Sequence, residues 1–527
     1  MALKEEWGGI TDDALLVQIL VDVPVRRAQS FARLSKQMRR VAQRVLEVQF
    51  GLNPEQASAF LDAMRGHNVF LTGGAGVGKS HTLGIIRVWL ERIEREYALT
   101  ASTGCAAAIV GAATFHSTLG IGLAVKGPAF YAHKILKEDK GRRTRLRNLE
   151  TLIIDEIGML DGQLFDKAGQ VVAQVRTSHV DSSGALVRNG TTGPYGGVQV
   201  IACGDFMQLP PVQVEAKKWV FQSKAWAALG FRNHLLTTVH RQSGDDRFAE
   251  VLGRMRLGQS THEDWRYLVE NDAHKGGGDP QSALRLFATN APADQVNWET
   301  LLATVGQAEG PNWWEPTAVS PHAHRFRAPP HMFRALDEGA THLLEHCPAP
   351  KVLWLCEGAR VMCLKNLLDR LVNGSLGTVT RIARKMYARP SGQVDGIQVE
   401  IVVLFDGLLG AAPFEHVFQV DSHRMPDRAV CEFSIRDTKD KKAKACRQQL
   451  PLRLAWACSI HKSQGMSLDR VVIDFSKCFS DGQAYTALSR VRSLAGAWLI
   501  GLEYRHMHMV SRFAKRWYEA LPLARWE

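Results

Sequence analysis

Residues 68–95 read NVFLTGGAGVGKSHTLGIIRVWLERIER, and the fold is organised around this stretch. The apolar run at residues 69–71 predicts a buried strand. Residues 73–80 match the pattern G-x-x-x-x-G-K-[ST], which is typical of phosphate-binding loops. Apolar side chains then recur at helical spacing as far as Ile93. The sequence therefore predicts a strand, a phosphate-binding loop and a helix in immediate succession.

The composition of the loop suits the binding of phosphate groups. Glycines let backbone N–H groups curl around phosphate oxygens, and the helix N-terminus adds positive partial charge there. Lys79 can reach the outer phosphates, and the Ser80 hydroxyl can ligate Mg²⁺. The alternative, an ordinary glycine-rich turn, is disfavoured because strand, loop and helix are all in register. We predict that a nucleoside triphosphate is bound by Gly73, Gly74, Ala75, Gly76, Val77, Gly78, Lys79, Ser80 and His81.

The bulk properties narrow the class of protein. A chain of 527 residues predicts several domains, and its net charge of +12 favours nucleic acid as a partner. The nine cysteines include no C-x-x-C pair, which indicates a reducing compartment rather than a disulfide framework or a structural zinc. No apolar run is long enough to span a membrane. The N-terminus resembles neither a signal nor a transit peptide, which leaves the compartment open and favours the nucleus over the mitochondrion.

Two further predicted strands end in residues suited to a nucleotide. The strand at residues 151–154 runs into Asp155 and Glu156, and doubly wound sheets place their ligands at such strand ends. Asp155 can hold Mg²⁺ through water, while Glu156 can orient the attacking water and accept its proton. The next strand leads into the segment GDFMQLPP. There Gln208 can contact the terminal phosphate. Phe206 and the rigid pair Pro210-Pro211 can meet a nucleic acid base or couple the two sites.

Gln56 has two interpretations. Asn53 can cap a helix whose first turn contains Pro54, and Gln56 then occupies the capping-box position. The functional interpretation is that its amide reads adenine, since the amide has both a donor and an acceptor. The capping interpretation predicts a helix just before the phosphate-binding loop.

Residues 1–50 are predicted to form a helical extension. The pattern ITDDALLVQILVDVP…FARLSKQMRRVAQ weakly resembles an F-box, which would give this segment a protein partner. The simpler interpretation, a helical pair that packs on the core or touches DNA, is favoured because apolar helical stripes are common.

The remaining sequence predicts two α/β domains, which would match duplicated RecA-like P-loop domains. Residues 51–230 form the first, with a small basic insertion at about 113–147. Residues 231–527 form the second, in which alternating apolar runs at about 378–450 predict an inserted β-rich, barrel-like module.

Ten stretches between residue 52 and about residue 502 together resemble the Pif (petite integration frequency) DNA helicases of superfamily 1B. In order, they are LTGGAGVGKS, TASTGCAA, TFHSTLGIG, LIIDEIGMLDG, GGVQVIACGDFMQLPPV, VHRQ, VMCLKN, LVNGSLGTV, WACSIHKSQGMSLD and GQAYTALSRVRS. Residues 303–350 match no stretch of the family, and the segment between Leu160 and Gly196 is longer than expected.

The resemblance implies two RecA-like domains with ATP and Mg²⁺ between them. Arg241 and Arg490 would then reach from the second domain as arginine fingers, because guanidinium groups stabilise the charge that builds up in phosphoryl transfer. The alternative for Arg490 is a salt bridge on a helix surface. The implied catalytic residues are Lys79, Glu156, Gln208, Arg241 and Arg490, with Ser80 and Asp155 for the metal and Gln56 for adenine.

The resemblance also implies a monomeric ATP-dependent DNA helicase. It would move 5′ to 3′ on single-stranded DNA and unwind forked or structured DNA in replication, recombination, repair or telomere maintenance. The strand would cross both domains, because hydroxyls and lysines take phosphates while aromatic and imidazole rings stack on bases. The candidate contacts are Thr103, Gly104, His116, Phe206, Ser459, His461 and Lys462. For His116 and His461 the alternative is a partly buried histidine whose hydrogen bonds are satisfied.

Three other functions fit the sequence less well. One is a conjugative relaxase-helicase or a RecD-like nuclease subunit. Relaxases use a pair of metal-binding histidines, and residues 322–324 (HAH) and 506–508 (HMH) have that form. Both pairs lack an evident third ligand, so chance is the favoured interpretation. An ATP-driven adaptor would recruit a partner through residues 1–50. A non-enzymatic nucleic-acid binder fits poorly with Glu156 and both arginines present.

Overall fold

The computed structural model describes most of the chain beyond residue 49. The described residues are 50–103, 106–107, 110, 112–122, 124, 126–181, 186–188, 193–211, 219–242, 244–274, 280, 283–305, 331–339, 344, 347, 349–365, 367–368, 371, 375–388, 394–406, 412–421, 431–436 and 444–523. The predicted N-terminal extension and its possible protein partner lie outside these residues, apart from Phe50. No described helix is long and apolar enough to cross a lipid bilayer.

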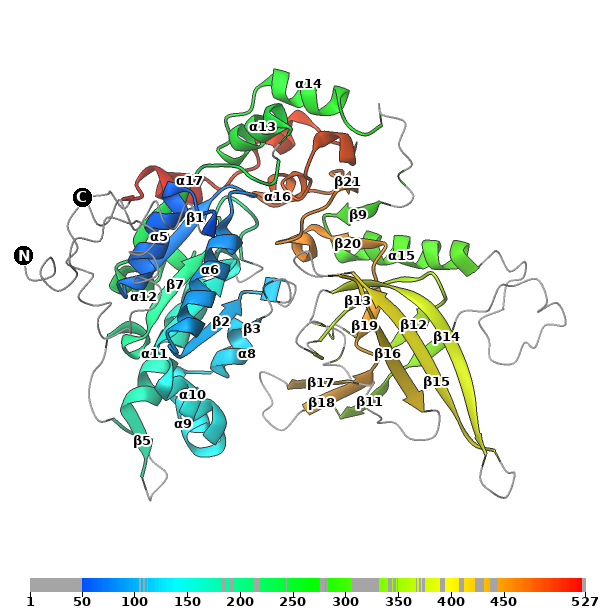
Figure 1. Cartoon of the computed structure of the whole chain (residues 1–527), viewed down its shortest axis with the longest axis horizontal. Coiled ribbons are helices and arrows are strands. Elements are labelled where there is room, and N and C mark those ends of the chain that lie inside the picture. The colour runs from blue at the N-terminus through cyan, green and yellow to red at the C-terminus, as the bar shows by residue number, and fades with distance from the viewer. Residues whose placement is uncertain are drawn as a thin grey trace, which may run out of the picture.

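The first domain is built on a six-stranded parallel sheet in the order β3-β2-β4-β7-β1-β8 (Figure 1). The strands are β1 (Val69–Gly73), β2 (Tyr97–Ala101), β3 (Ala113–Thr114), β4 (Thr151–Asp155), β7 (Gln199–Cys203) and β8 (Arg232–Leu236). Every residue of β1, β4 and β7 is buried, as expected for central strands that are covered on both faces. Because these strands are parallel, their carboxyl ends meet at one edge of the sheet.

Successive residues of β1 enter two cores on opposite faces of this sheet. Val69 and Leu71 pack with the helices at residues 54–64 and 79–92, whereas Phe70 packs with the helices at residues 128–138, 140–148, 162–177 and 224–229. The helices and short helical turns of this domain are α5 (Pro54–Met64), α6 (Lys79–Arg92), α8 (Phe115–Leu119), α9 (Pro128–Glu138), α10 (Lys140–Asn148), η1 (Ile157–Met159), α11 (Gly162–Thr177), η2 (Pro194–Gly197), η3 (Val220–Gln222) and α12 (Lys224–Leu229). A two-stranded hairpin, β5 (Ser178–Val180) and β6 (Leu186–Arg188), follows α11. The predicted insertion at 113–147 corresponds to β3 and the three helices α8, α9 and α10.

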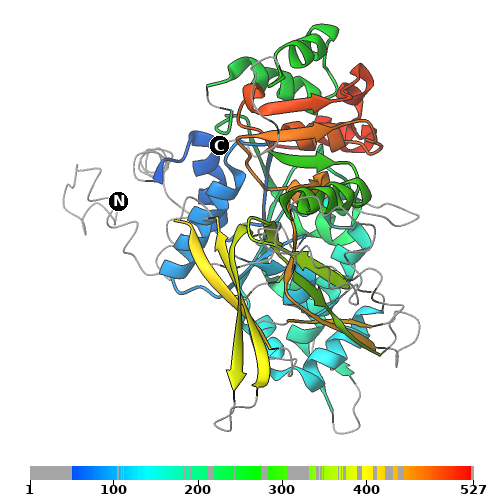
Figure 2. The same ribbon diagram turned by 90° about the vertical axis from the view of Figure 1, so that its right-hand side faces the viewer.

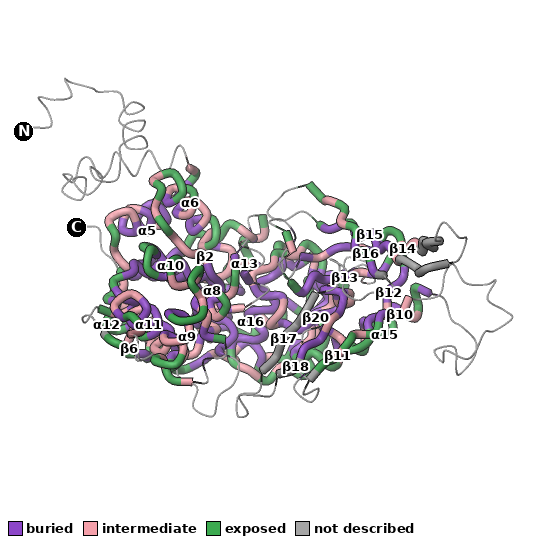
Figure 3. The backbone as a smooth tube through the Cα atoms, turned by 90° about the horizontal axis from the view of Figure 1, so that it is seen from below, coloured by how far each residue is buried: buried purple, intermediate pink, exposed green. Residues whose placement is uncertain are grey.

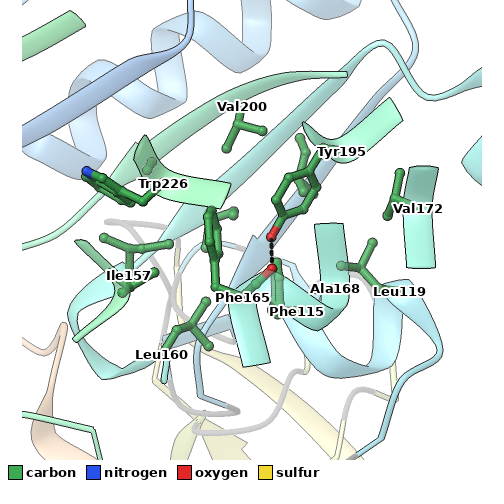
Figure 4. Packing of buried hydrophobic residues seen from close by; sticks show 14 of the residues in the cluster. Phe115, Leu119, Ile157, Leu160, Phe165, Ala168, Val172, Tyr195, Val200 and Trp226 are labelled. Carbon is green, nitrogen blue, oxygen red and sulfur yellow. Dashed lines mark hydrogen bonds between the residues drawn. The ribbon is translucent and has the colours of Figure 1, made fainter. Parts of the chain in front are cut away.

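Figure 4 shows how tightly α11 is held in the second of these cores. The Tyr195 hydroxyl donates a hydrogen bond to the Phe165 carbonyl oxygen at 3.0 Å. A Cβ atom at Gly169 would lie 2.9 Å from the Tyr195 ring, so only glycine allows this contact. Since α11 follows β4 after one short turn, this packing fixes the segment that leaves the end of β4.

The second domain contains a four-stranded parallel sheet in the order β20-β9-β21-β22. The strands are β9 (Leu284–Phe287), β20 (Ala457–Ser459), β21 (Val471–Asp474) and β22 (Ala497–Ile500). The helices and short helical turns are α13 (Asp246–Arg256), α14 (His262–Glu270), α15 (Asn290–Val305), η8 (Ile460–Ser463), α16 (Gln483–Leu488), η9 (Leu494–Gly496) and η10 (Tyr504–His508). The two parallel sheets are of the kind found in RecA-like domains.

An antiparallel module lies between β9 and β20 in the sequence. Its strands are β10 (His331–Arg334), β11 (Leu336–Gly339), β12 (Val352–Leu355), β13 (Arg360–Cys363), β14 (Leu376–Ala388), β15 (Val394–Phe405), β16 (Phe414–Asp421), β17 (Cys431–Arg436), β18 (Lys444–Gln449) and β19 (Leu452–Leu454). They form sheets of five, three and two strands in the orders β16-β15-β14-β13-β19, β11-β18-β17 and β10-β12. The long strands β14 and β15, in yellow, extend away from the parallel sheet of their domain (Figure 2).

This module is longer than the predicted range of about 378–450. Among the described residues, antiparallel pairing runs from His331 to Leu454. The short apolar runs of β12 and β13 read equally well as buried parallel strands, so periodicity alone did not separate them from the α/β domain. The described strands lie in three sheets, and none of these closes into a barrel.

Two segments that the predicted boundaries place in the second domain pack on the first. Strand β8, which begins at Arg232, pairs with β1 in the first sheet. The last helix, α17 (Arg512–Glu519), returns to the first domain, where Trp517 and Tyr518 pack on the core around Phe70 (Figure 1). Helix α16, whose six residues are all buried (purple in Figure 3), packs with α13 in the core of the second domain.

Candidate nucleotide cleft and DNA track

The phosphate-binding loop joins the end of β1 to the start of α6. Gly73 has φ +142°, and a Cβ atom there would lie 2.3 Å from the Leu236 carbonyl oxygen. Gly78 has φ +84°, and its Cβ would lie 2.3 Å from Gln56 Nε2. Both positions therefore require glycine, which explains two of the fixed letters of the motif.

The loop is held by side chains from within and from the second domain. Lys79 Nζ donates hydrogen bonds to the carbonyl oxygens of Gly73 (3.0 Å) and Gly74 (2.7 Å). The backbone N–H of Ala75 donates to the Tyr485 hydroxyl at 2.9 Å. Tyr485 lies on α16, so this bond joins the loop directly to the second domain.

Two carboxylates follow the end of β4. Glu156 adopts φ +50°, ψ +42°, a left-handed conformation that costs free energy for any residue with a Cβ. Its backbone N–H donates to Asp155 Oδ1 at 2.8 Å. Burial raises the pKa of both carboxyl groups, and for Glu156 the neighbouring Asp155 charge raises the pKa further. A cationic ligand at this point would therefore be strongly favoured.

The oxygen atoms present fit a magnesium ion. The Ser80 hydroxyl donates to Asp155 Oδ2 at 3.5 Å, so a hydroxyl and a carboxylate from different elements point to the same place. Mg²⁺ prefers oxygen ligands and commonly takes one or two from protein, with the remainder from water and phosphate.

The opposite wall of the cleft is formed by two arginines of the second domain. Arg241 Nη1 donates to the Ser489 carbonyl oxygen at 2.8 Å. Arg490, which is 2% exposed, donates from Nε to the Thr486 carbonyl oxygen at 2.9 Å. Neither guanidinium forms an ion pair with a carboxylate of the described chain. Burial, and then the charge of Arg490, lowers the pKa of Arg241 to about 9, while burial also lowers the pKa of Arg490. Two neighbouring cations, Arg490 buried and Arg241 partly buried, favour the binding of an anion.

These groups surround a single cavity of about 210 Å³. Its lining residues are Ala75, Gly76, Gly78, Lys79, Ser80, His81, Asp155, Glu156, Gln208, Arg241, Gly465 and Arg490. All five predicted catalytic residues and both predicted metal ligands are among them. Gln208 is 3% exposed, and its Oε1 atom has no hydrogen-bond partner within the described part of the chain. The cavity therefore offers an unsatisfied amide beside cationic and acidic groups.

Some residues predicted to bind the nucleotide lie outside the lining. Val77 is buried in the core with α5 and α6. Gly73 and Gly74 belong to the loop but do not line the cavity. Gln56 forms the capping box, since its N–H donates to Asn53 Oδ1 and its Oε1 accepts from the Asn53 N–H, both at 2.9 Å. The structural interpretation of Gln56 thus holds, and its contact with adenine stays a prediction.

The candidate DNA contacts are divided between the two domains. Thr103 follows the end of β2, and its hydroxyl accepts from the Ala106 N–H at 3.2 Å. His116 lies on α8, while His461 and Lys462 lie on η8 just after β20. Burial lowers the pKa of both histidines. Ser459 is 4% exposed, and Gly104 lies outside the described residues.

The predicted contact between Phe206 and a base was wrong. Phe206 has no exposed surface, and its ring lies 5.2 Å from that of Phe70 and 5.1 Å from that of Trp517. An aromatic residue beside a functional motif can be part of the core as easily as part of a binding surface, and the sequence did not separate the two.

Two contacts at the cleft were not predicted, although Asp205 and Gln464 both lie in stretches that carry the family resemblance. Asp205, at the end of β7, forms a bidentate ion pair with Arg256 of α13 at 2.9 and 3.0 Å, and its side chain is fully buried. The Arg256 guanidinium lies 4.9 Å from the ring centre of Tyr518, whose hydroxyl donates to Asp205 at 3.3 Å. The second contact is made by Gln464, whose amide reaches Glu156 across the cleft. Both depend on contacts between residues far apart in the chain.

The histidine pairs considered for a relaxase find no support. His506 is buried and accepts the Glu503 N–H at 3.1 Å, and the described residues contain no cluster of three or more metal-ligating side chains. The other pair, at 322–324, lies outside the described residues.

Comparison with known proteins agrees with this geometry. Residues 51–266 match the family model PIF1-like helicase, and residues 340–382 match the model DNA helicase Pif1, 2B domain. The human ATP-dependent DNA helicase PIF1 is 35% identical over 453 residues, which are 84% of this chain and 60% of that protein. ATP-dependent DNA helicase Pif1 of Bdellovibrio bacteriovorus is 34% identical over 475 residues, which are 89% of this chain and 92% of that protein.

Solved structures are also similar. The crystal structure of Pif1 helicase from Candida albicans has a TM-score of 0.72 at 31% identity, covering 89% of this chain and 99% of that chain. Pif1 from Bacteroides in complex with ADP-AlF3 and ssDNA has a TM-score of 0.64 at 25% identity, covering 89% and 96%. The chain spans about three fifths of the length of the eukaryotic relatives it matches. From the match to the bacterial relative over nearly its whole length, and from the family models, this chain belongs to the PIF1-like helicase family.

Proposed function

We propose that this chain is an ATP-dependent DNA helicase. ATP is bound between the two domains, its hydrolysis closes and opens the cleft, and the domains thereby move along single-stranded DNA. The observation that carries the proposal is one cavity in which Lys79 and Glu156 of the first domain face Arg241 and Arg490 of the second. Such a site is complete only when both domains meet, which links catalysis to domain closure.

The proposed roles follow from the chemistry of each group. Lys79 holds the outer phosphates, and Gln208 contacts the terminal phosphate through its amide. Glu156 orients the attacking water and accepts its proton. Arg241 and Arg490 neutralise the charge that develops on the transferred phosphoryl group. Ser80 and Asp155 would hold Mg²⁺, which when bound neutralises charge on the phosphates.

The proposed DNA substrate is single-stranded or forked DNA. The Bacteroides relative was solved with ADP-AlF3 and ssDNA, and a further similar structure concerns DNA unwinding at forked dsDNA by two coordinating Pif1 helicases. In this chain Thr103 and His116 of the first domain, with His461 and Lys462 of the second, are the proposed contacts. The 5′-to-3′ direction, the monomeric state and roles in replication, recombination, repair or telomere maintenance rest on the family resemblance alone.

Replacement of Lys79 tests the proposal. Lys79→Ala should reduce DNA-stimulated ATP hydrolysis to background while retaining most of the affinity for single-stranded DNA, because the two sites are separate. Lys224→Ala, at an exposed lysine of the same domain, is the matched control and should hydrolyse ATP normally. Forked substrates that carry only a 5′ or only a 3′ tail then test unwinding and its direction. Hydrolysis that survives in Lys79→Ala would show that the nucleotide site is misplaced.

A further inference from the structure

Gln464 lies between the candidate DNA track and the catalytic carboxylate. It directly follows η8, the short turn that carries His461 and Lys462. Its side chain crosses the cleft, and Nε2 donates a hydrogen bond to Glu156 Oε2 at 3.4 Å. The next residue, Gly465, lines the nucleotide cavity. One short segment thus runs from the DNA track to the base of the hydrolysis reaction.

The environment of Gln464 gives this contact a defined geometry. The residue is 1% exposed, so its amide is shielded from water. Its Oε1 atom has no hydrogen-bond partner among the described residues, and an unpaired buried acceptor is costly. The turn that precedes it is itself fixed, since the Ser463 hydroxyl donates to the Ile460 carbonyl oxygen at 2.8 Å. A displacement of this turn must therefore move the amide.

Glu156 is poised to respond to such a movement. Its backbone has the strained left-handed conformation described above, which persists only where surrounding contacts hold the residue. The hydrogen bond from Gln464 is one of these contacts. The bond from Gln464 occupies one carboxylate oxygen and leaves the other for the attacking water. At 3.4 Å this bond is at the long end of the range, so a small shift of η8 would shorten or break it.

We infer that Gln464 is the positioning residue through which single-stranded DNA stimulates ATP hydrolysis. DNA seated on His461 and Lys462 presses η8 into place, the Gln464 amide closes on Glu156, and the carboxylate is then aimed at the water. The inference rests on the proposed function, because it requires a helicase with DNA-dependent ATP turnover.

The test uses two replacements of Gln464 that should lower kcat to different extents. Gln464→Met keeps the length of the side chain and removes the amide donor. It should lower kcat at saturating single-stranded DNA by about 10- to 100-fold, the effect of one hydrogen bond to a charged group. Gln464→Glu keeps the shape and places a second carboxylate against Glu156, so it should lower kcat further. In both variants the KM for ATP and the DNA concentration for half-maximal stimulation should stay within about twofold of the unchanged chain, since one hydrogen bond that acts on Glu156 alone contributes to neither binding step.

The matched control is Gln449→Met in the antiparallel module. Gln449 is also 1% exposed; its amide nitrogen donates to the backbone carbonyls of Phe333 and Pro350, and its amide oxygen accepts the Leu450 N–H at 2.9 Å. Its replacement should reduce thermal stability and leave the stimulation by DNA intact. If Gln464 acted only through packing, Gln464→Glu should have the higher kcat of the two variants, because Glu fills the site better than Met.

Three results would overturn the inference: full stimulation in Gln464→Met, a kcat for Gln464→Glu equal to that of the unchanged chain, or a loss explained entirely by weaker DNA binding. Should Gln464→Met fail to fold, the near-isosteric Gln464→Glu alone decides. If the unchanged chain shows no DNA-stimulated ATP hydrolysis, the proposed function fails instead, and the two failures are distinguishable.

Discussion

The nucleotide cleft gathers charged groups into one cavity, whereas the candidate DNA contacts are spread over strand ends in two separate sheets. In the cleft, Lys79, Arg241 and Arg490 face Asp155 and Glu156 across about 210 Å³. Charged groups gathered this closely in a partly buried site are costly without a ligand of complementary charge. The DNA track consists of partly buried groups that are each common in ordinary structure. The difference teaches that an enclosed charged site identifies its ligand more sharply than an open surface.

The largest expected effect tests the second-domain wall of the cleft. Arg490→Lys should lower ATP turnover about 1,000-fold, because an ammonium cannot make the bidentate contact to a phosphoryl group that a guanidinium makes. Arg492→Lys is the matched control, since Arg492 is 60% exposed and pairs with Asp469 at 3.1 Å. Steady-state ATP hydrolysis at saturating DNA is the measurement. A rate for Arg490→Lys within tenfold of the control would remove Arg490 from the catalytic site.

The second prediction concerns the ion pair that joins the domains behind the cleft. Arg256→Ala leaves Asp205 buried without its partner and should lower the free energy of unfolding by about 3–5 kcal/mol. Arg247→Ala on the same helix removes an exposed pair with Glu263 and should cost no more than about 1 kcal/mol. Denaturant titration of both variants measures the difference. Equal losses would mean that α13 is not anchored through Asp205.

The third prediction sharpens the boundary between track and core. Phe206→Leu should lower the free energy of unfolding by about 1–2 kcal/mol, because the ring is enclosed by other aromatic residues. Affinity for single-stranded DNA should be unchanged. Phe479→Leu, at a ring that is 67% exposed, should leave stability unaltered. A selective loss of DNA affinity in Phe206→Leu would restore Phe206 to the track.

The smallest expected effect is the pH dependence of DNA binding. Burial lowers the pKa of His116 and His461 below their ordinary value, so both rings are neutral at pH 7 and gain charge only as the pH falls below that lowered pKa. Affinity for single-stranded DNA should therefore change by less than about twofold between pH 8 and pH 6.5 from these groups. Binding measured across this range by fluorescence anisotropy, with His116→Gln and His461→Gln for comparison, provides the test. A tenfold rise in affinity that disappears in the variants would show charged imidazoles on the track.

The first-domain side of the cleft was predictable because its chemistry is local in the sequence. A phosphate-binding loop needs glycine at two left-handed positions and a Lys-Ser pair at the next helix, and all of these lie within eight residues of one another. The carboxylates were predictable for the same reason, since they end a buried apolar strand. Parallel pairing of β1, β4 and β7 then brings these local motifs together.

Contacts between distant parts of the chain were decided only by the tertiary structure. The sequence named Arg241 and Arg490 through a family resemblance, but only the fold brings them into the cavity of Lys79. The burial of Phe206, the ion pair of Asp205 with Arg256 and the reach of Gln464 to Glu156 had no local signature. Each depends on how the two parallel sheets and the C-terminal helix α17 pack against one another. That packing is determined by the total apolar surface that becomes buried, and no short motif encodes it.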